Sequence, residues 1–174
     1  DLEDKWDGGF EEWFGKIKNL PFGLELRGGQ YLNRFGLQNN IHNHAWIFAD
    51  QYLTNGLLLG EDGLTTIGGE VSWKLPVSWT SLISVSVGMP REEDEHHHDE
   101  PAMEPEFEAE GALFDGTFVV ANWTNNFDYN DFHQFRGGLS GAWGDNKWGL
   151  TTQIYGAHFE YLWRQNGYEA GGRY

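Results

Sequence analysis

The stretch that decides the fold is Ile67-Gly68-Gly69-Glu70-Val71-Ser72-Trp73-Lys74-Leu75. Its odd positions are apolar or glycine, and its even positions are Gly, Glu, Ser and Lys. Successive side chains of an extended strand point to opposite faces, so this alternation predicts a β-strand with one apolar face and one wet face. The same alternation resumes at residues 82–89, after Pro76. The two segments therefore predict an antiparallel hairpin with a tight turn at residues 75–79.

Five more segments alternate in the same way. They lie near residues 10–19, 24–34, 116–126, 132–143 and 148–163. In the segment at 132–143, Phe135, Leu139 and Trp143 share one face and oppose Gln134 and Ser140. The sequence thus predicts an all-β chain of about seven strands, joined in an antiparallel, up-and-down order.

The placement of the aromatic residues and the connection lengths indicate what surrounds this sheet. The chain has 9 Trp, 7 Tyr and 12 Phe, and many lie near predicted strand ends, as in a membrane barrel or in the core of a β-sandwich. Connections at 20–23, 76–79 and 127–131 are short, whereas two of the three between them, at 36–64 and 90–115, are long. Short turns on one side and long loops on the other are typical of outer-membrane barrels, although the third outward connection, 144–147, is also short.

The sequence therefore predicts a transmembrane β-barrel wall of a bacterial outer membrane, built from residues 1–174 as one unit with its long loops outside the cell. No run of about 18 apolar residues exists, which argues against a membrane helix. Bacterial barrels usually have an even number of strands, with eight the smallest. We therefore expect seven strands to form an incomplete barrel, and outer-membrane lipid to be a partner.

Composition excludes several functions. Cysteine is absent, so a disulfide scaffold and a thiol nucleophile are excluded. The net charge of −16, from 27 Asp and Glu against 11 Lys and Arg, argues against binding nucleic acid and favours cations. No nucleophile–base order or nucleotide loop stands out, so we expect no enzyme activity and no organic cofactor. Metal binding would have to use His and carboxylate groups.

The most biased stretch of the chain is an acidic tract with three consecutive histidines. Carboxylates and imidazoles both suit zinc, nickel and copper. The tract lacks the fixed ligand spacing of a structural site, so it predicts a diffuse collector of divalent metal. The alternative is a solvated acidic loop with incidental histidines. The candidate ligands are Glu95, His96, His97, His98, Asp99 and Glu100.

A second candidate site lies in the first long loop. His42 and His44 are two residues apart and would point the same way on an extended backbone, with Asp50 close enough to supply an oxygen ligand. The alternative is that the two histidines only bond to backbone carbonyls. Residues 45–59 are too apolar for a free loop in water. We expect them to fold back into the barrel mouth, with a short helix, and to narrow the pore.

Several short pieces of the chain resemble a family of bacterial outer-membrane proteins described as zinc-regulated receptors or porin-like barrels. The resemblance implies an outer-membrane barrel linked to the acquisition of zinc or another metal, with a His- and acid-rich loop at residues 96–98. The chain departs from receptor-type uptake because it shows neither a plug domain nor an energy-coupling box. The similar pieces are LELRGGQYLNRFG at 24–36, HNHAW at 42–46, DQYL at 50–53, LGEDGL at 59–64, GEVSWKLP at 69–76 and IYGAH at 154–158.

These observations lead to one hypothesis and two rivals. The hypothesis is an outer-membrane barrel that binds divalent metal, zinc first, at its extracellular loops and admits it or another small solute. One rival is a structural or adhesive surface barrel without transport. The other is a soluble, carbohydrate-binding β-sandwich. Association with copies of the same chain in a homo-oligomer stays open at this point.

Overall fold

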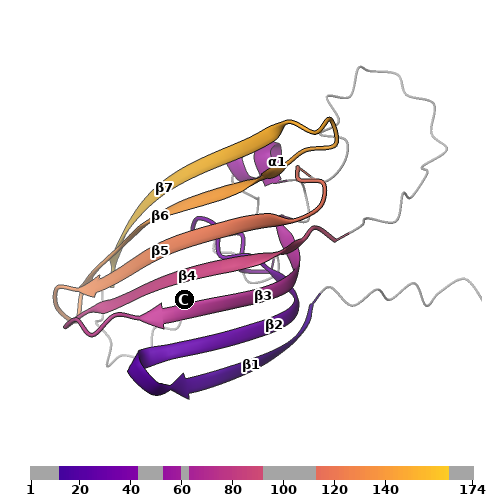
Figure 1. Ribbon diagram of the computed structural model, residues 1–174. Coiled ribbons are helices and arrows are strands. Elements are labelled where there is room, and N and C mark those ends of the chain that lie inside the picture. The colour runs from indigo at the N-terminus through magenta and orange to yellow at the C-terminus, as the bar shows by residue number, and fades with distance from the viewer. Residues whose placement is uncertain (1–11, 43–52, 60–62, 92–112, 165–174) are drawn as a thin grey trace, which may run out of the picture.

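The computed structural model describes residues 12–42, 53–59, 63–91 and 113–164. They form one seven-stranded sheet in which the strands follow one another in chain order, each antiparallel to the next (Figure 1). This confirms the predicted all-β class and the up-and-down order. Within the described ranges, β1 and β7 are the two edges of the sheet. The strands are β1 (Trp13–Leu20), β2 (Leu24–Leu32), β3 (Thr65–Lys74), β4 (Thr80–Met89), β5 (Phe118–Asp128), β6 (His133–Asp145) and β7 (Thr151–Trp163).

The connections confirm the predicted asymmetry. At one end of the sheet the turns are short: the 3-10 turn η1 (Pro21–Gly23) joins β1 to β2, and residues 75–79 and 129–132 join the next two pairs. In η1, Phe22 and Gly23 both have positive φ. At the other end, the first long connection leaves β2 at residue 33 and returns to β3 at residue 64, and the second leaves β4 at residue 90 and returns to β5 at residue 117. The short connection 146–150 lies at the same end. These two ends are called the short-turn end and the long-loop end below.

The register fixes which side chains share a face. One row of cross-strand partners is polar and buried, and it consists of Ser72, Ser84, Asn122 and Ser140. The adjacent row is apolar: Leu26, Val71 and Val85 are 40%, 49% and 41% exposed. The sheet is curved (Figure 1), and the buried polar side chains lie on its concave face. The apolar side chains therefore cover the convex face.

Three glycines in one row bring the backbones of neighbouring strands together. Gly29, Gly68 and Gly88 are cross-strand partners on β2, β3 and β4. A Cβ added at Gly68 would lie 2.2 Å from the Val87 carbonyl oxygen, and Gly29 has a φ of +134°. Glycine kinks of this kind let a sheet bend. The three glycines of this row therefore allow the sheet to curve.

A small apolar cluster fills the concave side near the long-loop end. It combines β5–β7 side chains such as Phe118 and Ile154 with Phe35, Leu64 and Phe114 from the two long connections. Leu59, at the end of helix α1 (Leu53–Leu59), joins the same cluster, and α1 lies beside the ends of β6 and β7 (Figure 1). The short helix expected in this region is thus confirmed. No helix in the described ranges is long and apolar enough to cross a membrane.

Candidate functional site

The candidate site is the concave face together with the segment that follows β2, residues 33–42, which we call the inward segment. Asn33 begins it and is fully buried. Its Nδ2 donates a hydrogen bond to Thr66 Oγ1, and Ser86 Oγ donates one to Asn33 Oδ1 at 2.6 Å. The amide of one side chain therefore ties the start of the segment to β3 and to β4.

The inward segment then runs across the concave face towards β6 and β7. The Gly36 backbone N–H donates to Ser140 Oγ on β6 at 2.9 Å, and Asn122 Nδ2 donates to the same oxygen at 2.9 Å. Phe35 packs over Gly156 of β7, where an added Cβ would be 3.2 Å from the ring. β2 is the second strand of the sheet and β7 is the last. These contacts therefore span most of the width of the concave face.

Asn39 fixes the second half of the inward segment. Its Nδ2 donates to the carbonyls of Asn33 and Leu64 at 2.8 and 3.1 Å, and its Oδ1 accepts from the Leu64 backbone N–H at 2.8 Å. One buried side chain thus closes the segment onto the residue that precedes β3. The inward segment is held by hydrogen bonds at both ends and in the middle.

Charged side chains on the concave face lie beside side chains of opposite charge. In the middle of β2 and β3, Arg27 Nη2 lies 2.7 Å from Glu70 Oε2, and Arg34 Nε of the inward segment lies 3.6 Å from Glu70 Oε1. Further along the sheet, Arg136 Nη1 lies 3.3 Å from Glu160 Oε2. Ion pairs of this kind are compatible with a surface that contacts water, whereas charged side chains are unfavourable against lipid.

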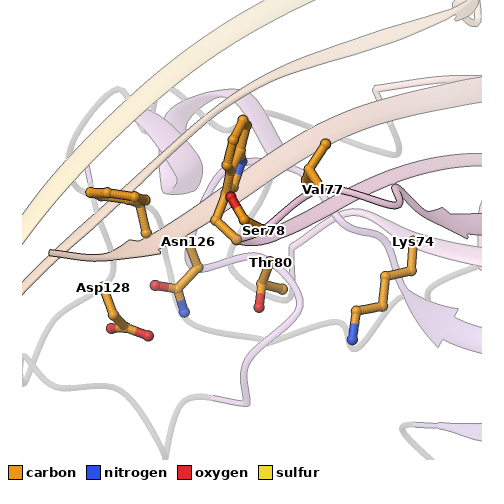
Figure 2. Close-up of a pocket in the computed structure, with 8 residues that line it drawn as sticks. Lys74, Val77, Ser78, Thr80, Asn126 and Asp128 are labelled. Carbon is orange, nitrogen blue, oxygen red and sulfur yellow. The ribbon is translucent and has the colours of Figure 1, made fainter. Parts of the chain in front are cut away.

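A shallow hollow of about 280 Å³ lies at the short-turn end (Figure 2). Lys74 and Asp128 stand on either side of Thr80 and Asn126 (Figure 2). The remaining lining comes from the turn and the end of β5, at Val77, Ser78, Trp79 and Phe127. The hollow joins charged and aromatic groups, but it holds none of the predicted metal ligands.

Of the predicted metal ligands, the structure places His42. Its Nε2 lies 2.9 Å from Glu12 Oε2, and the other Glu12 oxygen accepts a hydrogen bond of 2.7 Å from the Leu32 backbone N–H. The other predicted ligands, His44, Asp50, Glu95, His96, His97, His98, Asp99 and Glu100, lie outside the described residues. Within the described ranges, no three His, Asp or Glu side chains form a group that could hold a metal ion.

Sequence reasoning missed Glu12. It lies 30 residues before His42 in the chain, and only the pairing of β1 with β2 brings the two together. The available signal is its place at the start of the predicted strand near residues 10–19, at the end of the sheet where the first long loop begins. A carboxylate beside an imidazole is a pair that many metal sites contain, although two ligands do not complete one.

Comparison with protein-family models and with solved structures gives no match for this chain. Among curated proteins, a 77-residue region is 35% identical to an uncharacterized protein of Aquifex aeolicus (strain VF5). That region is 44% of this chain and 16% of the relative. The chain therefore spans a small part of a longer relative, whose name assigns no activity.

Proposed function

We propose that this chain forms part of the wall of an outer-membrane β-barrel that admits small solutes past the inward segment. The reversed polarity of the two faces carries this proposal. The convex face exposes large apolar side chains, and the concave face buries Ser, Asn, Gln and charged groups. A sheet in water has the opposite preference, whereas a barrel in lipid needs apolar residues outside and polar residues inside.

The dimensions of the sheet support the same proposal. Strands β3 to β7 have 10 to 13 residues, and ten residues of tilted strand span an apolar layer of about 25 Å. Exposed aromatic side chains lie on the convex face near both ends. The short-turn end has Trp73, Trp123, Phe127, Tyr161 and Trp163, and the long-loop end has Trp13. Trp148 is also exposed at the long-loop end, in the connection 146–150. Amphipathic rings at these two levels suit the two membrane interfaces.

The described residues also argue against a soluble β-sandwich. A sandwich packs two sheets face to face about 10 Å apart, and within the described ranges there is a single sheet. Its concave face instead carries the inward segment, which is anchored to β3, β4 and β6. In a barrel, a segment fixed in this way would narrow the interior and limit passage to small solutes.

We propose divalent metal, zinc first, as a solute that the long-loop end binds. The Glu12–His42 pair supports this part, because an imidazole and a carboxylate meet at 2.9 Å at that end. His44, Asp50 and the tract at 95–100 would add further nitrogen and oxygen ligands. The resemblance to zinc-regulated outer-membrane proteins agrees with this choice of metal.

Purification and bilayer recordings test the barrel. The chain in its natural full-length protein should need detergent to stay soluble and should conduct ions in planar lipid bilayers. A monodisperse protein without detergent would overturn the membrane assignment and favour a soluble sugar-binding protein. Stable insertion without conductance would overturn solute passage and favour the structural or adhesive barrel.

A zinc titration tests the metal part separately. Micromolar zinc should shift the imidazole resonances of His42, and Glu12→Gln should weaken that shift. His133→Gln is a suitable control, because His133 lies at the short-turn end beside Tyr161. No shift at micromolar zinc would remove the metal proposal and leave the barrel proposal unaffected.

A further inference from the structure

Two guanidinium groups face one carboxylate on the concave side of β2 and β3. Arg27 and Arg34 approach the two oxygens of Glu70 at 2.7 and 3.6 Å, and Ser72 Oγ donates to Oε1 at 3.0 Å. These side chains are largely buried: those of Arg27, Arg34 and Glu70 are 9%, 17% and 2% exposed. Both oxygens of the Glu70 carboxylate therefore have partners. Two guanidinium groups and one carboxylate leave the cluster with one net positive charge.

Within the described ranges, a further carboxylate near the cluster is that of Glu25, which Lys16 and Arg34 share electrostatically. Lys16 lies opposite Arg27 on β1, and Lys16 Nζ holds the nearby Glu25 at 2.6 Å. The Tyr31 ring lies 3.8 Å below the Arg27 guanidinium. A ring stabilises the flat face of a guanidinium, but its N–H groups still need acceptors in the plane. Arg27 Nε is buried and has no hydrogen-bond partner.

The negative net charge of the full chain does not apply to the described residues. The described residues contain nine Lys and Arg and eight Asp and Glu, although the full chain has 11 and 27. The surplus of acids therefore lies in other segments of the sequence. Positive and negative side chains are thus nearly equal in number within the described ranges, and Arg27, Arg34 and Glu70 form a cationic cluster where the inward segment meets the sheet.

We infer that Arg27 and Arg34 bind a small oxyanion, a carboxylate or a phosphate group, on the concave face. Guanidinium forks match the paired oxygens of such groups, and a buried net charge without a counterion is costly. Arg27 belongs to the wall and Arg34 to the inward segment, so the oxyanion joins the two. This inference goes beyond the proposed function and does not depend on solute passage.

Binding of inorganic phosphate to the folded full-length protein in detergent tests the site. The readout is the urea midpoint of unfolding in sodium phosphate, sodium acetate or sodium chloride at equal ionic strength. Phosphate and acetate should raise the midpoint above that in chloride, because a ligand that binds only the folded state stabilises it. Equal midpoints in all three salts would overturn the inference, including the case in which a carboxylate of the chain already fills the site.

Two variants and one control locate the effect. Arg34→Gln should remove the phosphate-dependent shift, and Arg34→Lys should weaken binding about tenfold, because it keeps the charge and loses the fork. The control is Lys74→Gln, which removes an inward-facing cation near the hollow of Figure 2. A shift that persists in Arg34→Gln, or that disappears in Lys74→Gln, would assign the effect to general screening and overturn the site.

Discussion

The two faces of the same strands differ in what they bury. On β3 and β4, Val71 and Val85 are exposed on the convex face, while Ser72 and Ser84, one residue away, are almost fully buried on the concave face. Burial in this sheet therefore does not follow hydrophobicity. The apolar face of the described sheet is the exposed one, and the polar face is the buried one.

The concave face is therefore held together in a different way from a soluble core. Hydrogen bonds among Asn33, Ser86 and Ser140 and the ion pair of Arg27 with Glu70 replace most of the apolar packing. Apolar contact is concentrated in the cluster near the long-loop end. Polar interiors of this kind depend on satisfied partners, because an unpaired buried group costs more than a made bond contributes.

The largest expected effect comes from a charge on the convex face. Val85→Arg places a guanidinium in the middle of the apolar rows, and a charge at the centre of a bilayer costs about 2 to 4 kcal/mol in a β-barrel. We expect the variant to fold into lipid vesicles poorly compared with the unmodified protein. The measurement is the urea dependence of folding into vesicles, followed by tryptophan fluorescence.

Val85→Leu is the matched control, since it keeps the face apolar and should fold as the unmodified protein does. If Val85→Arg and Val85→Leu folded equally well, the convex face would not contact lipid. The contrast between the two faces would then need another explanation, such as a protein partner on the convex side.

Much of the sheet could be predicted from the sequence. A period of two residues identifies strands and assigns faces: it predicts that Phe135, Leu139 and Trp143 share one face, and the register places them on one face. Short and long connections were also recognisable, because turns need few residues. Alternation has a purely local cause, so it needs no knowledge of distant contacts.

The interior could not be predicted in the same way. Nothing in the sequence distinguishes Asn33, Asn39 or Ser140 from other polar residues. Their hydrogen-bond partners depend on the curvature of the sheet. Likewise, the Glu12–His42 pair depends on which strand lies beside which. Contacts between residues 30 to 104 positions apart leave no local pattern.

The next effect concerns the curvature that joins the two faces. Gly68→Ala would place its Cβ 2.2 Å from the Val87 carbonyl oxygen and 2.6 Å from the Gly88 Cα. Backbone atoms would have to move, which we expect to cost about 1 to 3 kcal/mol. The measurement is the free energy of unfolding from urea titration in detergent.

Gly28→Ala provides the matched control on the neighbouring strand. The nearest atom to its Cβ would be the Gly68 carbonyl oxygen, at an ordinary 3.8 Å, so its stability should stay within about 0.5 kcal/mol. Equal losses for the two variants would show that loss of glycine flexibility matters, and not the close approach of the strands in this row.

The smallest effect tests whether the concave face holds the inward segment. Ser140→Ala removes the acceptor of the Gly36 N–H and of Asn122 Nδ2, and the lost hydrogen bonds should lower the free energy of unfolding by about 1 kcal/mol. Ser78→Ala, in the exposed turn at the short-turn end, should change it little. Proteolysis adds a local readout, because cleavage within residues 33–42 should accelerate in Ser140→Ala while cleavage elsewhere stays constant. If both variants were cleaved at the rate of the unmodified protein, the hydrogen bonds of Asn33 and Asn39 alone would hold the segment. The hydrogen bond from Gly36 to Ser140 of β6 would then not be needed.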